Sequence, residues 1–507
     1  MIMRGLTILI SVVLMACSLS AHAEKRKEIK RYERPRLVVG VVVDQMRWDY
    51  LPRYYDKLGN DGLRRLIDDG YSCDNTMINY VPTVTAVGHA SIYTGATPAL
   101  HGIAGNNFKM NGRRQTSVRD TTVATVGTDQ KRTGQASPRL LLASTIGDQL
   151  KIDTDFRSKV VGVSFKDRAA VLPAGHTADM AFWLDVKELQ FVTSTYYMKE
   201  LPEWVKQYNS QLTGLDELKA QGDTMVYSPE INRMVTEMAM EAVKNEQLGQ
   251  RDVTDMLCIS YSQTDYLGHR YGTRDWRVDN MYIELDKQIA RLLQMLDKQV
   301  GRGNYLLFLT ADHGAIHNPM FMYEHKMPGA PWRVMNVIRR LDRELMQDFG
   351  VDNLVMGLIE YRLYLDDKVI NANHLNRDSV KAAAVRHLRQ LPRVAYAVAF
   401  DEVATSAIPD FLRERIIRGW HPQRSGDIQI VLDPGYVYHN PTSSPAGSNH
   451  AAWNPYDSHI PLLFYGWHVP KGCTSRPTYI TDIAATVCSM IHLQMPNACI
   501  GNPIEMK

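Results

Sequence analysis

The sequence predicts an α/β protein built on a central, mostly parallel sheet flanked by helices. Three apolar runs without polar alternation, at residues 37–43, 256–260 and 305–309, are typical of strands buried on both faces of a sheet. An amphipathic helix is expected around residues 285–296, where leucine and isoleucine recur on one face. Strand, helix and strand in succession favour right-handed crossovers, which place neighbouring strands parallel.

Composition is ordinary for a soluble globular protein. The 507 residues suffice for one large domain with insertions or for two domains, with 45% hydrophobic and 22% charged residues. A formal net charge of +3 is too small to indicate a nucleic-acid partner, so no nucleic-acid binding is expected.

Residues 1–23 have the pattern of a signal peptide. Arg4 supplies positive charge, residues 6–14 form an apolar segment, and Ala-His-Ala at 21–23 offers a cleavage site. The alternative is a lipoprotein signal in which Cys17 is acylated. Both routes export the protein, with a periplasm as the expected destination. The segment is too short to span a bilayer, and no transmembrane span is expected in the mature chain.

The cysteines argue against a cysteine metal site, because no Cys-x-x-Cys spacing occurs. Cys258 lies inside an apolar run and is expected in the core. Export permits disulfides, and the best candidates, whose pairing stays open, are Cys473, Cys488 and Cys499.

Polar residues follow the first and the last of the three apolar runs. Asp44 comes directly after residues 37–43, and Asp312 and His313 close the run that begins at Tyr305. Open α/β sheets bind ligands at the carboxyl ends of their strands, and a carboxylate beside an imidazole suits a divalent metal such as zinc. The alternative for each aspartate is a helix N-cap or a turn.

A helix is expected soon after Pro82, with residues 86–93 in its first turns. Thr85 stands at its start, where a hydroxyl either caps the helix or acts as a nucleophile beside backbone N–H groups that favour anions. The glycine-rich loop at residues 101–107, which contains Asn106, either faces a phosphate or is an ordinary loop.

Lys166 and Arg168 lie at the end of a further strand-like run, residues 160–168. Two positions apart in an extended chain, they point to the same side. Exposure to solvent is one interpretation. The other is an anion clamp, in which lysine supplies a point charge and arginine a planar fork.

Asp265 and His269 follow the run at residues 256–260. Their spacing of four places both on one face of a helical turn, as metal ligands often are. Residues 335–427 break the strand–helix rhythm and predict an inserted α+β subdomain over the site. Residues 428–432 are expected to rejoin the central sheet, ahead of a polar loop that contains His450.

Three carboxylates and three imidazoles thus follow buried strands or lie in a loop that faces them. They divide naturally into two sites of three ligands, each with an open coordination position, as catalytic zinc requires. The six residues are Asp44, Asp265, His269, Asp312, His313 and His450.

These motifs resemble the alkaline phosphatase superfamily, and within it the exported phosphate-irrepressible (PafA-type) alkaline phosphatases. Those enzymes share motifs with nucleotide pyrophosphatase/phosphodiesterases. The resemblance covers most of the chain and implies an alkaline-phosphatase-like catalytic domain at residues 24–507, with the inserted subdomain at about 335–427. It rests on residues 38–45, 82–89 and 101–106, on Asp265 with 268–269, and on 310–314.

The resemblance also implies roles for individual residues. Thr85 would be the nucleophile and would contact the first of two Zn²⁺ ions. That ion would be held by Asp44, Asp312 and His313. The second ion would be held by Asp265, His269 and His450. Phosphoryl oxygens would be contacted by Asn106, Lys166 and Arg168.

One departure from the family pattern concerns the last zinc ligand. The family usually has His-Gly where this chain has His450 and Ala451, and His459 lies nine residues further on. His450 is preferred because it keeps the spacing to the late strand at residues 460–466 that relatives show. His459 is expected to support the loop.

The implied activity is zinc-dependent hydrolysis of phosphate monoesters through a phosphothreonine intermediate. A monomer is expected, although the sequence leaves the oligomeric state open. Lys166 and Arg168 favour a monoester dianion over a diester, which carries one charge and a second bulky group. A nucleotide pyrophosphatase/phosphodiesterase with the same two-zinc site is one alternative, and a phosphate- or zinc-binding periplasmic protein without turnover is another. A sulfatase is disfavoured, because its formylglycine is made from Cys or Ser and Thr85 cannot serve.

Overall fold

The computed structural model describes residues 33–212, 220, 222–439, 444 and 446–507. Residues Pro35–Lys507 form one compact unit, which contains all the helices and strands of the described chain. The expected signal peptide, with Cys17, lies outside the described residues. In the part of the chain that the structure describes, no helix combines the length and apolar character needed to cross a membrane.

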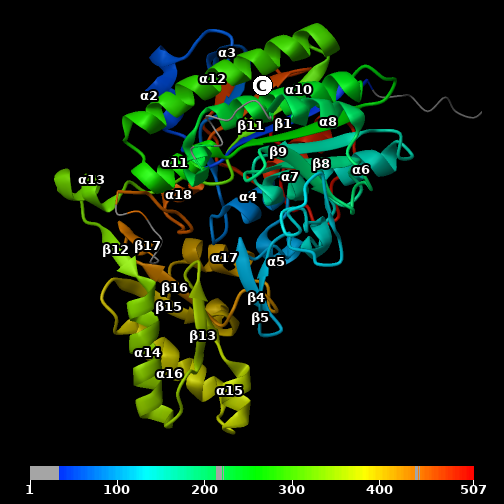
Figure 1. Ribbon diagram of the computed structural model, residues 1–507. Helices are drawn as coiled ribbons and strands as arrows, with labels where there is room; N and C mark the ends of the chain where they lie inside the picture. The colour runs from blue at the N-terminus through cyan, green and yellow to red at the C-terminus, as the bar shows by residue number, and fades with distance from the viewer. Residues whose placement is uncertain (1–32, 213–219, 221, 440–443, 445) are drawn as a thin grey trace, which may run out of the picture. The chain divides into compact units, whose positions relative to one another are not determined.

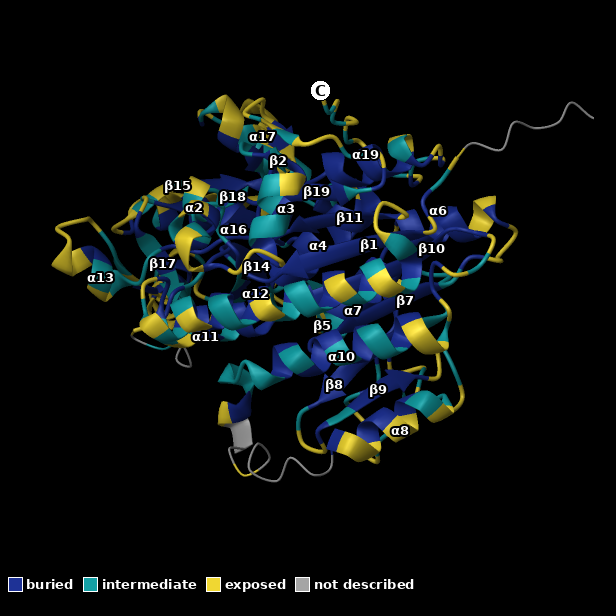
Figure 2. Ribbon diagram, turned by 90° about the horizontal axis from the view of Figure 1, so that it is seen from above, coloured by how far each residue is buried: buried dark blue, intermediate teal, exposed yellow. Residues whose placement is uncertain are grey.

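The predicted central sheet is confirmed, with ten strands in a single sheet. Its middle five strands, β11-β1-β10-β7-β8, run parallel, and most of their residues are buried (Figure 2). In spatial order the strands are β20 (Gly472–Thr474), β2 (Tyr71–Cys73), β19 (Leu462–Gly466), β11 (Tyr305–Thr310), β1 (Leu37–Val43), β10 (Asp255–Tyr261), β7 (Val160–Ser164), β8 (Met180–Asp185), β9 (Gln190–Ser194) and β6 (Thr125–Val126).

Helices cover both faces of this sheet (Figure 1). On one face lie α10 (Glu230–Asn245) and α12 (Trp276–Leu296), whose apolar stripe is buried as expected. On the other lie α4 (Thr85–Thr94) and α7 (Asp167–Ala174). Close packing there requires a glycine in β7, because a Cβ at Gly162 would stand 2.4 Å from the carbonyl oxygen of Ala170 in α7.

A second, antiparallel sheet has the order β13-β14-β16-β15. Its neighbours in sequence include α14 (Val334–Phe349) and α16 (Arg377–Arg389). The strands are β13 (Val355–Ile359), β14 (Arg362–Leu365), β16 (Ile428–Leu432) and β15 (Val394–Ala399).

The expectation that residues 428–432 rejoin the central sheet was therefore wrong. β16 lies between β14 and β15 in the second sheet, and all five of its residues are buried. An apolar run indicates burial on both faces, but it does not specify which strands are its partners. The extent of the inserted region, expected at about 335–427, stays a prediction.

The cysteines of the described chain carry free thiols in the structure. Cys258 is buried in β10, as expected for a core residue. The other free thiols belong to Cys73, Cys473, Cys488 and Cys499.

Candidate functional site

The candidate site lies where the parallel strands β1, β10 and β11 end. Asp44 follows β1, and Asp312 and His313 follow β11. Asp265 and His269 lie one turn apart in α11 (Gln263–Tyr271), which follows β10. Because the three strands are adjacent and parallel, their carboxyl ends meet at one edge of the sheet.

Asp44, Asp312 and His313 form the first of two groups of potential metal ligands. One donor atom from each residue lies within 4.8 Å of the others, and all three side chains are fully buried. His313 Nε2 is 3.4 Å from Asp44 Oδ1 and 3.6 Å from Asp312 Oδ2.

Asp265, His269 and His450 form the second group. His269 Nε2 lies 3.1 Å from Asp265 Oδ1 and 3.3 Å from His450 Nε2. The His450 ring stacks on His313 with 3.7 Å between ring centroids and 15° between planes, so the two groups are in direct contact.

Each of the three imidazoles is oriented by a backbone carbonyl. The Nδ1 atoms of His313, His269 and His450 lie 2.9, 3.0 and 2.7 Å from the carbonyl oxygens of Gly314, Ser448 and Thr83. With Nδ1–H donating to a carbonyl, Nε2 is left as an unprotonated ligand atom, which is the usual arrangement around a bound metal.

Buried polar atoms without hydrogen-bond partners indicate whether these residues can bind a cation. Asp44 Oδ1, Asp312 Oδ2 and His313 Nε2 are buried without a hydrogen-bond partner among the described residues. Buried polar atoms normally have partners, and three such atoms in one cluster fit coordination of a cation. Burial lowers the pKa of His313 and of His450, which favours the neutral form that metal binding requires, whereas at His269 the charge of Asp265 outweighs burial and raises the pKa. The donor set of carboxylates and imidazoles suits zinc.

Lys166 lies between the two groups. Its Nζ is 2.5 Å from Asp44 Oδ2 and 2.6 Å from Asp265 Oδ2, and the side chain is 2% exposed. The expected extended chain from 160 to 168 was wrong at its end, because β7 stops at Ser164 and Lys166 is the N-cap residue of α7. The two cations are nevertheless near each other, since Arg168 is in the first turn of that helix.

The pKa values of Asp44 and Asp265 shift in opposite directions. Burial raises the pKa of Asp44 well above its usual range, and the charges of Asp265 and Asp312 act in the same direction. Burial also acts to raise the pKa of Asp265, but the charges of His269 and Lys166 outweigh it and hold that pKa well below its usual range. The crowded negative charge therefore calls for a compensating cation.

Thr85 is the first residue of α4 and is buried. The side-chain oxygen of Asn106 accepts the Ala86 N–H at 2.9 Å, which places that amide group at the start of the same helix. His89, one turn further on, has Nδ1 2.8 Å from the Thr85 carbonyl and 3.3 Å from Asp312 Oδ2. The helix start is thus joined to the first ligand group.

His459 does not belong to either group. Its ring stacks on Trp48 with 4.7 Å between centroids, and its Nε2 lies 2.9 Å from the Asp74 carbonyl. Ala451 adopts φ = +91°, a left-handed conformation in which glycine is unstrained, so the backbone after His450 is shaped as a His-Gly sequence would allow.

Sequence reasoning missed two residues that connect these parts. Gln45 has φ = +63°; its backbone N–H donates to Asp312 at 3.1 Å and its side chain donates to Asp265 at 2.6 Å. Asp457 accepts the Ala452 N–H at 2.8 Å and so holds the loop that carries His450. Only their closeness in sequence to Asp44 and His450 could have indicated them.

Comparisons with known proteins show which family the chain belongs to. The family model described as type I phosphodiesterase/nucleotide pyrophosphatase matches residues 38–457. Alkaline phosphatase PafA of Elizabethkingia meningoseptica is 42% identical over 517 residues, covering 93% of this chain and 94% of the relative. A Myroides odoratus protein named calcium-transporting ATPase is 41% identical over 98% of both chains.

A crystal structure of wild-type PafA superimposes with a TM-score of 0.89 and 41% identity, covering 93% of this chain and 99% of that chain. The similarity to PafA therefore extends over nearly the whole length of both proteins. The chain therefore belongs to the type I phosphodiesterase/nucleotide pyrophosphatase family of the alkaline phosphatase superfamily, and within it is similar to PafA-type alkaline phosphatases.

Proposed function

We propose that this protein is a two-zinc alkaline phosphatase that hydrolyses phosphate monoesters. The observation that carries the proposal is the pair of three-ligand groups in contact with each other, with Lys166 between them. Bound at Asp44, Asp312 and His313 and at Asp265, His269 and His450, two Zn²⁺ ions would supply Lewis-acid stabilisation of the attacking and departing oxygens.

Thr85 Oγ1 is the nucleophile of the proposed reaction. It loses its proton and forms a bond to phosphorus, while the bond from phosphorus to the alcohol oxygen breaks and that oxygen gains a proton. A water molecule then attacks phosphorus of the phosphothreonine, the bond from phosphorus to Thr85 Oγ1 breaks, that oxygen takes a proton from the water, and inorganic phosphate leaves. The N-terminus of α4 favours the negative charge that gathers there.

Three further side chains would bind the transferred phosphoryl group. Lys166 and Arg168 supply two positive charges, and the Nε of Arg168 is buried with no hydrogen-bond partner within the described chain. Asn106 has its oxygen engaged by Ala86, so its NH₂ group is the side of the amide that can donate to phosphate. Two cations match the dianion of a monoester better than the single charge of a diester.

The test is kcat/KM for a phosphate monoester and a phosphate diester with the same leaving group. We expect a preference for the monoester. Thr85→Ala should remove nearly all turnover at unchanged zinc content. Lys166→Ala combined with Arg168→Ala should reduce monoester hydrolysis much more than diester hydrolysis, and equal losses would contradict the specificity argument. Arg157→Ala, at an exposed ion pair with Asp252, serves as a control.

The family model favours one other activity, nucleotide pyrophosphatase/phosphodiesterase, which the same residues could support. A diester preference in the wild-type enzyme would establish it. ATP belongs in the substrate panel because of the name of the Myroides relative. A phosphate- or zinc-binding protein without turnover would keep its function in the Thr85→Ala variant.

We further propose that the protein is exported through residues 1–23 and acts as a monomer. Cell fractionation of the full chain and of a form lacking residues 1–23 tests the first statement. Light scattering of the purified protein tests the second.

A further inference from the structure

The turn between β13 and β14 has an unusual composition. Ile359 pairs with Arg362, so the hairpin closes through the two residues Glu360 and Tyr361, which have φ values of +50° and +63°. Such turns prefer Asn-Gly or Asp-Gly, because left-handed conformations strain other side chains. Strained residues persist where the surrounding structure holds them, often at functional sites. The two side chains therefore need an explanation beyond the turn itself.

Glu360 contacts the loop that carries a proposed phosphoryl ligand. Its Oε1 accepts the backbone N–H of Asn106 at 3.1 Å. Its Oε2 packs directly against Gly105, where an added Cβ would stand 2.2 Å from it. Arg168 is among the positive charges that act on Glu360. A carboxylate near an anion site would repel the substrate, so its presence calls for a compensating role.

Arg362 anchors the same turn to the chain on both sides of the site. Its buried guanidinium donates to the carbonyl oxygen of Val81, four residues before Thr85, at 2.7 Å. It also donates to the carbonyl oxygen of Ala104, two residues before Asn106. Arg362 thus holds the two segments together. It also fixes the turn from which the Glu360 carboxylate contacts the backbone N–H of Asn106.

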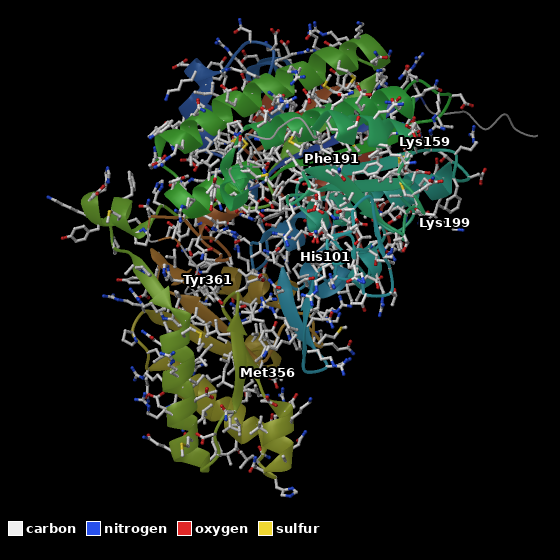
Figure 3. All side chains as sticks on the ribbon, viewed as in Figure 1. His101, Lys159, Phe191, Lys199, Met356 and Tyr361 are labelled. Carbon is white, nitrogen blue, oxygen red and sulfur yellow. The ribbon has the colours of Figure 1, made fainter. Side chains whose placement is uncertain are left out.

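Tyr361, which Figure 3 labels, connects the turn to the loop that carries His450 by way of Tyr438. Its hydroxyl oxygen accepts the Tyr438 N–H at 2.7 Å, and the Tyr438 carbonyl accepts a hydrogen bond from the side chain of Asn449, next to His450. The turn and Arg362 beside it therefore bond directly to the segments before Thr85 and Asn106, and reach the loop that carries His450 through Tyr438.

We propose that Glu360 is a positioning residue for phosphoryl binding and acts through Asn106. The carboxylate holds the Asn106 backbone, while the Ala86 N–H holds the side-chain oxygen of Asn106. These two contacts together determine where the NH₂ group of Asn106 points. The inference rests on the proposed function, because it takes Asn106 as a ligand of the phosphoryl group.

The test is a double-mutant cycle on the zinc-loaded full chain, with Glu360→Ala, Asn106→Ala and the double variant. Glu360→Ala should lower monoester kcat/KM by roughly 10- to 100-fold, the usual effect of a misplaced binding group. In the Asn106→Ala background the same substitution should have no further effect. Glu360→Gln should stay within about threefold of wild type, because the amide oxygen can accept the same N–H.

Controls separate positioning from folding. Zinc content and the circular dichroism spectrum should be unchanged in every variant, and Glu188→Ala, at an exposed glutamate of the β8–β9 hairpin, should behave as wild type. Inhibition by inorganic phosphate gives a second readout, since Glu360→Ala should weaken phosphate binding only when Asn106 is present.

Two results would overturn the inference. One is full activity of Glu360→Ala alongside a damaged Asn106→Ala variant. The other is multiplication of the two losses in the double variant, which would mean that Glu360 acts independently of Asn106. A harmless Asn106→Ala substitution would instead refute Asn106 as a ligand of the phosphoryl group, and a wild-type protein that does not hydrolyse monoesters would refute the proposed function.

Discussion

Lys166 supplies the positive charge for two buried carboxylates, and replacing it with methionine tests that role. Its Nζ lies 2.5 Å from Asp44 and 2.6 Å from Asp265. At an effective dielectric constant of about 20, each pair attracts by roughly 6–7 kcal/mol before the cost of burying the charges. Removing one partner of a buried ion pair typically costs about 3–5 kcal/mol, because the remaining charge is left unpaired.

The effect should depend on zinc. We expect Lys166→Met to lose about 3–5 kcal/mol of unfolding free energy in zinc-free protein. In zinc-saturated protein the bound cations neutralise the carboxylates, and the loss should fall below about 1.5 kcal/mol, as for a volume-conserving substitution. By linkage, the difference of about 2–4 kcal/mol should appear as roughly 30- to 1,000-fold tighter zinc binding by the variant.

The assay is guanidinium unfolding of wild type and variant, with chelator and with excess zinc, together with zinc titration. Lys151→Met is the matched control. Lys151 is a similarly buried lysine that pairs with Asp179 at 2.8 Å, outside both ligand groups, so its replacement should cost the same with and without zinc. A zinc-independent loss in Lys166→Met, or weaker zinc binding, would refute the reasoning.

Three other outcomes are expected. Removing metal with a chelator should abolish activity and zinc should restore it; activity after complete metal removal would exclude the two-zinc proposal. Ala451→Gly should keep activity and raise the unfolding free energy by up to about 1 kcal/mol, because Ala is strained at φ = +91°, and a lower unfolding midpoint would contradict this. Burial raises the pKa of Glu360 to about 7, above its ordinary value of about 4.3, so the folded state binds its proton more tightly than the unfolded state does. The stability of wild type relative to Glu360→Gln should therefore fall as pH rises from about 4.3 to about 7 and stay level above that; pH-independent unfolding differences would count against it.

Five of the candidate ligands could be located from the sequence because three of them come directly after apolar runs and two lie in the helix that follows a third run. Asp44 and Asp312 come within two residues of strands β1 and β11, and a buried strand is recognisable without its partners. Neighbouring parallel strands then bring their carboxyl ends together whatever the details of the loops. His450 lies in a loop, and its preference over His459 rested on the spacing that relatives show.

Other features depend on contacts between residues far apart in the chain. The sequence of β16 is apolar enough for either sheet, and only its pairing with β15 shows that it belongs to the second sheet. Lys166 has the expected extended backbone, but α7 begins directly after it and places Arg168 in a helix, and the Lys166 ammonium group pairs with Asp44, 122 residues earlier. Neither outcome follows from local periodicity.

The sequence by itself determined the sheet, the order of its motifs and the residue types that can bind metal and phosphate, because strand burial and ligand chemistry are local properties. Tertiary structure alone decided how these residues are held. Gln45 joins Asp265 to Asp312, and Glu360 reaches Asn106 from 254 residues away. Such contacts require that separate chain segments first be packed together, and packing is set by the complementary shapes of all the segments at once.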